Sequence, residues 1–212
     1  MAENVAGVVI PDSPLVREAT ELVRAAADDL LFNHSRRAYL WGMLHGSRLG
    51  LEPDPELLYV AAMFHDLGLT PNFRRTDQRF ELDGADAARA FLLEHDYSHD
   101  EAQRVWLAVA LHTTREIPDR LEPEIALLIA GVATDVVGAA VDGLTAEQIA
   151  EVITAHPRTG FADGILRAFH AGMKDRPETT FGTMNADVLA YFDPTFTRTN
   201  LVDLIKRNEL PE

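Results

Sequence analysis

Two histidines and two aspartates of this chain stand in apolar surroundings and are residue types that bind transition metals. His65 and Asp66 follow the uncharged run 57–64 (LLYVAAMF), which predicts a buried helix whose last turn carries both side chains into the interior. Asp135 is the only charged residue of a second apolar run, 125–141. Because an ionised carboxylate that is buried without a positive partner costs several kcal/mol, each aspartate predicts a cation beside it.

His34, near the start of a third predicted helix, completes a set of two imidazoles and two carboxylates. Such a mixed nitrogen and oxygen set suits zinc, iron, manganese, cobalt or nickel. The chain has no cysteine, which excludes disulfides and thiolate ligands. We therefore predict one divalent transition metal, zinc before the others, bound by His34, His65, Asp66 and Asp135. His45 shares the helix face of His34 but lies about three turns further along, too far to bind the same ion.

The order of these residues, H…HD…D, resembles that of the HD-domain superfamily, helical metal-dependent hydrolases named for their His-Asp doublet. Within that superfamily the chain is most similar to the cyanamide hydratase-like group. The segments that carry this resemblance are 32–39 (FNHSRRAY), 65–70 (HDLGLT), 79–89 (RFELDGADAAR), the His112-Thr113 pair and Asp135. The resemblance spans about residues 30–140 and is more specific for the metal site than for the substrate.

The resemblance implies hydrolysis or hydration by a metal-bound hydroxide, because water on such a metal loses a proton near neutral pH. Asp66 is expected to orient that water and accept its proton. His112 lies on the apolar face of a predicted helix, and the resemblance places it in the active site. It would line the pocket or bind a second ion; a buried core histidine is the other interpretation.

The loop that leaves the doublet is where we expect substrate contacts. The resemblance implies that Thr70 and Asn72 lie near the substrate. Arg74 and Arg75 are either ligands for an anionic or polar group or solvated loop charges. We include all four as candidate substrate-binding residues.

Three functions fit these patterns. The first is a hydratase or hydrolase that acts on a small C–N compound, such as a cyanamide or a nitrile. The second is a phosphohydrolase for a nucleotide or another small phosphomonoester, with Arg36, Arg74 or Arg75 holding the phosphate. Leu69 counts against it, because the nucleotidase branch of the superfamily has a glutamate three residues after the aspartate of the doublet. The third is a metal-stabilised binding or regulatory domain. Site chemistry favours the first.

The composition is that of an ordinary globular protein with one sizeable core: 212 residues, 47% hydrophobic and 25% charged. A net charge of −15 disfavours nucleic acid and anionic membranes, so we expect a small-molecule substrate as the partner. No apolar run is long enough to span a membrane, and residues 1–12 show no basic and apolar leader, which favours a cytoplasmic protein.

Helical spacing throughout predicts an all-α fold, an HD-type helical bundle of nine or ten helices around the buried metal site. Residues 1–12 are expected to be a tail and 13–212 a single domain. Its metal-site core is expected at about 30–140, and its C-terminal helices are expected to cover that core or to form the dimer surface of a homo-oligomer. Two of the predicted helices start at Pro14 and near residue 123. The others are predicted over residues 34–49, 56–67, 85–94, 100–113, 145–155, 161–174, 187–192 and 201–208.

Overall fold

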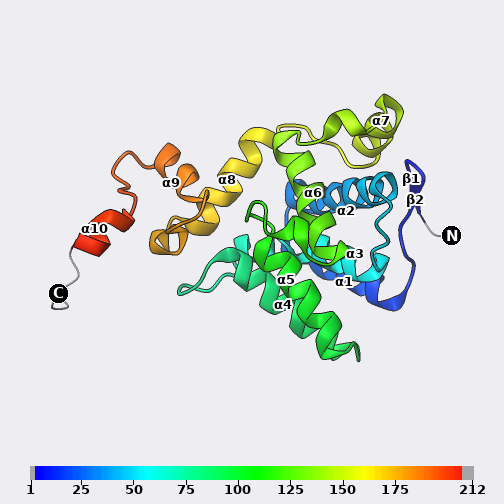
Figure 1. Ribbon diagram of the computed structural model, residues 1–212, viewed down its shortest axis with the longest axis horizontal. Helices are drawn as coiled ribbons and strands as arrows, with labels where there is room; N and C mark the ends of the chain where they lie inside the picture. The colour runs from blue at the N-terminus through cyan, green and yellow to red at the C-terminus, as the bar shows by residue number, and fades with distance from the viewer. Residues whose placement is uncertain (1–2, 207–212) are drawn as a thin grey trace.

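The computed structural model describes residues 3–206, and that part of the chain is almost entirely helical (Figure 1). Its α-helices are α1 (Pro14–Ala26), α2 (Asp29–Leu49), α3 (Pro55–Phe64), α4 (Phe80–Glu94), α5 (His99–Leu111), α6 (Pro123–Val137), α7 (Ala146–Ala155), α8 (Phe161–Met173), α9 (Ala186–Phe192) and α10 (Leu201–Lys206). The short 3-10 helices are η1 (Leu67–Leu69), η2 (Pro118–Arg120), η3 (Val141–Gly143) and η4 (Pro177–Thr180). The predicted all-α architecture is confirmed. Among the described residues, none of the helices combines the length and apolarity that a membrane crossing requires.

The N-terminal segment differs from the predicted tail. β1 (Asn4–Val5) pairs antiparallel with β2 (Val8–Val9) through a turn in which Ala6 and Gly7 both have positive φ, 53° and 83°. Positive φ at both central residues is the geometry that matches the twist of a two-residue hairpin. The buried side chains of this segment are Val5, Val8 and Ile10. These three apolar side chains therefore belong to the hydrophobic core.

Helix α3 lies at the centre of the bundle. Every residue from Leu57 to Phe64 is at most 1% exposed, as the uncharged run predicted. Helices α2 and α6 approach each other closely beside it, since a Cβ added to Gly131 would lie 2.0 Å from the Ala38 carbonyl oxygen. The absence of a side chain at Gly131 brings Asp135, one turn later on α6, against the side chains of α2.

The doublet lies at the end of α3 and not inside its last turn. The helix was predicted to run to Leu67, but it ends at Phe64, with His65 as its C-cap. The chain then turns through η1, where a Cβ on Gly68 would lie 2.0 Å from the Phe80 carbonyl oxygen. Glycine at this position therefore lets η1 pack directly on the start of α4, and the doublet remains in the interior.

Two other helix ends differ from the prediction. The start of α2 is capped by Asp28, whose side chain accepts from the backbone N–H of Leu31, so the helix begins at Asp29 and not at the predicted residue 34, and His34 lies in its second turn. Helix α6 ends at Val137, before the end of the apolar run 125–141, and its C-cap is Gly138 with a φ of 70°. Gly138 is a left-handed C-cap of the kind that glycine favours.

Two predicted helix starts are confirmed by their capping boxes, in which side chains bond reciprocally to backbone N–H groups. Ser98 and Glu101 form one at the start of α5, and Thr145 and Gln148 form the other at the start of α7.

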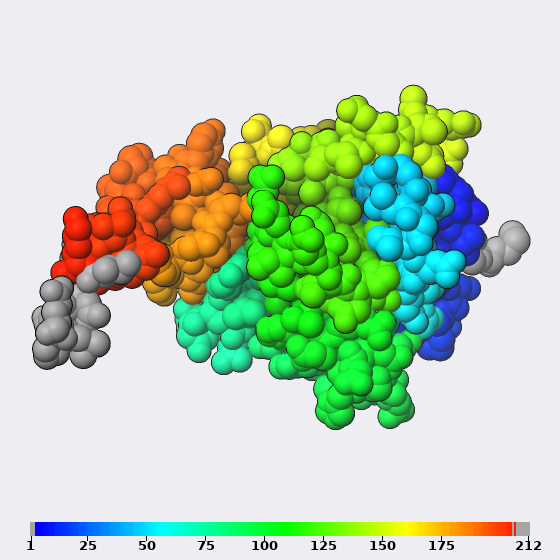
Figure 2. All heavy atoms as spheres, viewed as in Figure 1, coloured from blue at the N-terminus to red at the C-terminus, as the bar shows by residue number. Residues whose placement is uncertain are grey.

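Helix α8 packs beside the bundle, and α9 and α10 extend the molecule beyond it along its longest axis (Figures 1 and 2). A second hydrophobic cluster fills the contact between α8 and the bundle. Its buried members are Leu31, Leu69, Phe80, Phe161, Ile165, Met173 and Leu189. A Cβ on Gly172 would lie 2.7 Å from the Leu69 Cδ2, so α8 lies directly over η1 and the end of α3.

Arg176, which is 1% exposed, fastens the C-terminal helices to the loop after the doublet. Its guanidinium donates to the carbonyls of Gly68, Arg75, Gln78 and Gly172 and to the Asp83 carboxylate. Because a buried guanidinium needs all of its N–H groups satisfied, this network fixes the loop and α8 relative to each other.

Candidate metal centre

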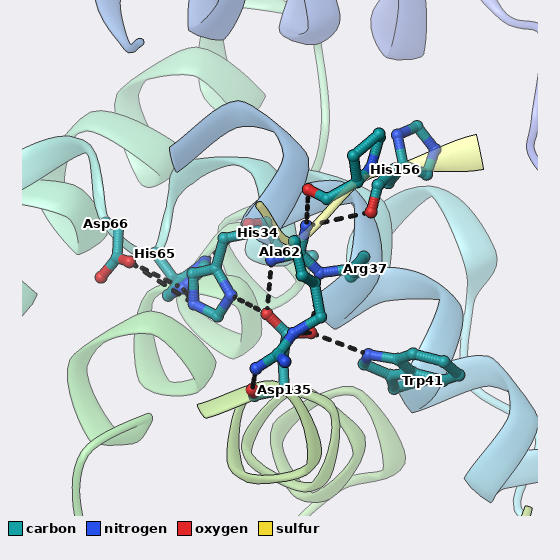
Figure 3. A network of polar contacts seen from close by, with 10 residues as sticks. His34, Arg37, Trp41, Ala62, His65, Asp66, Asp135 and His156 are labelled. Carbon is teal, nitrogen blue, oxygen red and sulfur yellow. Dashed lines mark hydrogen bonds and ion pairs between the residues drawn. The ribbon is translucent and has the colours of Figure 1, made fainter. Parts of the chain in front are cut away.

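Three of the four predicted ligands converge on one point in the interior. The Nε2 atoms of His34 and His65 are 3.1 Å apart. Asp66 Oδ2 lies 3.2 Å from the Nε2 of His65 and 3.6 Å from that of His34. The three side chains offer ligand atoms that all lie within 4.8 Å of one another, and none of the three residues is more than 2% exposed (Figure 3). They come from α2 and from the end of α3.

The histidine rings around Asp66 are oriented by hydrogen bonds at Nδ1. The acceptors are the Asp135 carboxylate for His34 (2.7 Å), the Ala62 carbonyl for His65 (2.7 Å) and the Val109 carbonyl for His112 (2.6 Å). Since each acceptor is an oxygen, each Nδ1 carries a proton, and in the neutral ring the Nε2 has a free lone pair. The lone pairs of His34 and His65 therefore face each other at 3.1 Å.

Asp66 and His112 add further acceptors without donors. Both carboxylate oxygens of Asp66 and the Nε2 of His112 are buried and have no hydrogen-bond partner among the described residues. The Nε2 of His112 lies 3.7 Å from Asp66 Oδ1. Buried polar atoms are rarely left unpaired, and an imidazole nitrogen without a proton cannot donate to a carboxylate oxygen or to another nitrogen. A divalent transition ion can be bound by the Nε2 atoms of His34 and His65 and by the Asp66 carboxylate, so this donor set fits such an ion.

The pKa values of the cluster reflect the same shortage of positive charge. Burial raises the pKa of Asp66, but the His65 and His34 imidazoles outweigh burial, and the pKa is lowered overall. Burial lowers the pKa of His65, and the Asp66 carboxylate outweighs burial, so this pKa is raised. Burial and the charge of His65 lower the pKa of His112 to about 4. Asp66 therefore stays ionised and attracts one cation, either a proton on His65 or a metal ion, and the two compete.

Asp135, predicted as the fourth ligand, lies behind His34. Its carboxylate accepts from the Nδ1 of His34, from the Nε and Nη2 of Arg37 at 2.7 and 2.8 Å, and from the indole of Trp41 at 3.1 Å (Figure 3). Both oxygens are thus used, and Arg37 supplies the positive charge that we had assigned to a metal. In this geometry Asp135 orients the His34 ring and is not part of the converging group, an arrangement often found around metal-bound histidines.

Arg37 is the site residue whose role the sequence interpretation missed. It lies one turn after His34 on a helix that is buried on that face, so the spacing places both side chains toward α6. The arginine itself is fully buried, and arginine is almost never found there unless it is paired. A buried arginine and a lone buried aspartate on two packed helices were the available signal.

A second polar network includes Thr113, the residue that follows His112. Glu81, which is 0% exposed, accepts from Arg79 (2.8 Å), from the Thr113 hydroxyl (2.5 Å) and from the Asn185 amide (2.9 Å). Burial raises the pKa of Glu81, but the hydrogen bond from Arg79 and the neighbouring charges outweigh it, so the pKa is lowered. The ionised carboxylate ties the end of α5 to the residue before α9.

The four candidate substrate-binding residues of the loop have contacts elsewhere. The Thr70 hydroxyl donates to the Leu67 carbonyl at 2.7 Å, and the Arg74 guanidinium donates to the Ala171 carbonyl of α8. Asn72 is exposed, and the exposed Arg75 side chain lies 3.5 Å from Asp77. These contacts do not bring the four side chains to the cluster, so their substrate role stays a prediction.

Aromatic rings line the side of the cluster that faces α8. The Phe161 ring is centred 5.1 Å from the ring of His34, and the Phe80 ring 5.5 Å from that of His112. Phe169 packs 5.5 Å from Phe80. The helical spacing of residues 161, 165 and 169 predicted a helix, but it did not indicate that this helix would form the wall of the metal centre.

The sequence was compared with protein families. The family model described as the HD domain matches residues 31–151, more than half of the chain. The matched segment contains all three converging ligands together with His112 and Asp135. Helix α8, whose Phe161 packs against His34, follows the matched segment, as does Asn185, which donates to Glu81.

Proposed function

The chain belongs to the HD-domain family, whose members are generally metal-dependent hydrolases, and on this premise we propose that it adds water to a small uncharged C–N compound of the cyanamide or nitrile type. We propose zinc as the ion. The ion would be held by His34, His65 and Asp66, whose unpaired acceptor atoms support this assignment.

The choice of substrate rests on one observation: the wall beside the cluster is apolar, and the nearby arginines are hydrogen-bonded to other groups of the protein. Arg37 is bound to Asp135 and to two backbone carbonyls. Arg36 is bound to Tyr59 and Glu3, and Arg74 to a backbone carbonyl. A phosphomonoester brings negative charge that proteins usually neutralise with free guanidinium or ammonium groups. A neutral nitrile carbon needs no such group, and the Phe80 and Phe161 rings provide an apolar surface for it.

A divalent ion in such a site supplies Lewis acidity and lowers the pKa of bound water to about 7. His112 is placed to handle the proton. Because its pKa is lowered to about 4, the ring is neutral near pH 7 and its Nε2 offers a lone pair beside Asp66. In the proposed reaction a C–O bond forms to the nitrile carbon and one C–N π bond breaks. His112 Nε2 accepts the proton lost by water and delivers it to the nitrile nitrogen.

The test is a pair of assays on the purified, zinc-loaded full chain. We expect urea to form from cyanamide, with no phosphate release from p-nitrophenyl phosphate or from a panel of nucleoside monophosphates. The variant His112→Asn should keep its zinc and lose about 10²–10⁴-fold in kcat, the usual contribution of a proton-transfer group. Phosphate release without urea formation would replace this proposal with a phosphohydrolase. A protein that takes up no transition metal would remove the catalytic proposal altogether.

A further inference from the structure

A surface pocket of about 270 Å³ adjoins the metal centre. One side is the first turns of α2, with Asp29, Leu30 and Asn33, and the other is the segment 157–161 that leads into α8. Ligand pockets for drug-sized molecules begin at about 300 Å³, so this pocket suits a smaller molecule. Asn33 directly precedes His34, which places the pocket against the ligand-bearing part of α2.

Phe161 alone is common to the pocket and to the wall of the centre. Its ring lines the pocket and is also centred 5.1 Å from the ring of His34. The three converging ligands are at most 2% exposed, so any substrate must pass a covering side chain. The ring of Phe161 separates the pocket from the first of these ligands.

The surroundings of Phe161 favour movement of the ring over movement of its helix. A Cβ on Gly164 would lie 2.0 Å from Leu30 Cδ1, so the first turn of α8 is packed tightly on α2. The ring itself lies under two guanidinium groups, with the Arg37 carbon at 4.9 Å and the Arg158 carbon at 4.7 Å from its centre. Arg37 is fully buried, whereas the Arg158 side chain is 38% exposed and lines the pocket. Arg158 is also paired with Asp135, whose Oδ1 lies 3.3 Å from its Nε, so both guanidinium groups are held in place and the Phe161 ring between them is the part that is free to rotate.

We propose that this pocket is the substrate entrance and that Phe161 determines the size of the molecule that reaches the metal. The inference rests on the proposed function, because it assumes an ion at His34, His65 and Asp66. It adds that the accepted substrates are small, since the Phe161 and Phe80 rings lie 5.1 and 5.5 Å from the rings of His34 and His112. It also assigns this selection to a residue that lies outside the segment matched by the family model.

The experiment measures access to the metal without relying on turnover. The full chain is loaded with Co²⁺, and its visible absorption is titrated with imidazole and with 1-butylimidazole, two neutral metal ligands that differ in length. The variants are Phe161→Ala, the milder Phe161→Leu, and Phe192→Ala as a matched control. Phe192 is a phenylalanine of α9 that stacks on His170, with ring centres 4.6 Å apart, and it does not line the pocket.

We expect the wild-type protein and Phe192→Ala to bind imidazole in preference to 1-butylimidazole. In Phe161→Ala that preference should shrink by about tenfold or more, the scale on which an apolar pocket discriminates by size. Phe161→Leu should lie between the two. An unchanged preference in both folded Phe161 variants would overturn the inference, as would an equal change in Phe192→Ala.

The two proposals fail in different ways. If the Phe161 variants lose the preference for imidazole over 1-butylimidazole but no form of the protein converts cyanamide to urea, the proposed entrance is supported and the proposed reaction is wrong. If cyanamide is hydrated and the preference does not shift, the reaction stands and the entrance is wrong. A chain that takes up no Co²⁺ overturns both.

Discussion

Asp66 and Asp135 are both buried aspartates at 2% exposure, yet their surroundings differ in what supplies positive charge. Asp135 has the guanidinium groups of Arg37 and Arg158, an indole and an imidazole, and both of its oxygens are used. Asp66 has imidazoles on three sides at 3.2 to 3.7 Å, and neither of its oxygens has a hydrogen-bond partner. The rule that a buried carboxylate requires a cation holds at both places. At Asp135 the protein provides a permanent cation, the Arg37 guanidinium, whereas at Asp66 the cation is either a proton on His65 or a metal ion.

This difference separates a part of the cluster whose polar atoms are bonded within the protein from a part whose acceptors have no hydrogen-bond partner. Arg37, Asp135 and His34 form a chain of fixed contacts that orients one imidazole, and it is complete without any ligand. Around Asp66 the same kinds of side chain are left unsatisfied and face inward. Unsatisfied acceptors in a fixed frame are what a metal site requires before the ion arrives.

The largest effect is expected at Asp66. The variant Asp66→Asn should reduce zinc content from about one ion per chain to near zero and abolish activity, because the only anionic ligand is lost. The metal-free variant should be at least as stable as the metal-free wild type, since the new amide N–H groups can donate to neighbouring imidazoles. Elemental analysis and thermal unfolding of the apo forms measure the two effects. A metal-free variant markedly less stable than the apo wild type would mean that Asp66 already has a partner.

The opposite effect on stability is expected at Asp135. Replacing it by alanine leaves the Arg37 guanidinium buried and unpaired, which should cost about 3–5 kcal/mol of unfolding free energy. Urea denaturation of the metal-free protein measures the loss. The double variant Arg37→Leu with Asp135→Leu should recover most of it, because an apolar pair needs no charge compensation. If Asp135→Ala alone were neutral, the contrast between the two aspartates would be wrong.

A smaller effect is expected on the affinity for zinc when Asp135 loses only its charge. In Asp135→Asn the side chain can still bond to His34, but it supports the ring less strongly. Changes to such supporting residues typically reduce metal affinity by about 10–100-fold. Competition with a chromogenic chelator measures this ratio on folded protein. A loss as complete as that of Asp66→Asn would make Asp135 a direct ligand.

The smallest effect is expected at His45, which lies on the same helix as His34. Its Nε2 is hydrogen-bonded to the Thr134 hydroxyl at 2.8 Å, and it has no place in the converging group. The variant His45→Ala should lose about 1 kcal/mol or somewhat more of stability, as for the loss of a buried hydrogen bond, with zinc content unchanged. Equal zinc loss in His45→Ala and His65→Ala would show that the ligand assignment is wrong.

Much of the fold could be predicted from the sequence, because helical spacing and capping residues act locally. Ser98 and Thr145 mark the helix starts that the structure has. Helix ends were less predictable: the end of α3 depends on the contact of Gly68 with the Phe80 carbonyl, which only the folded chain reveals. The hairpin at residues 4–9 was not predicted, since strands of two residues are too short to show an alternation of apolar and polar residues.

The sequence predicted which residues gather at the candidate site, but only part of the contacts between them. His34, His65 and Asp66 converge because each lies on a segment whose burial the sequence shows. The contact of Asp135 with Arg37 was not predicted, since the sequence does not tell a guanidinium on a facing helix from a metal ion. The wall made by Phe161 also required the packing of α8, which is remote in sequence from the ligands.

The central claim is that the ion is bound at Asp66 while Asp135 stays bound to Arg37. The most direct measurement is anomalous diffraction at the zinc edge from crystals of the zinc-loaded full chain. We predict one peak per chain, bonded to the Nε2 atoms of His34 and His65 and to the Asp66 carboxylate, with the Arg37–Asp135 pair intact. An ion bonded to Asp135 with Arg37 displaced, or no peak at this cluster, would contradict the account.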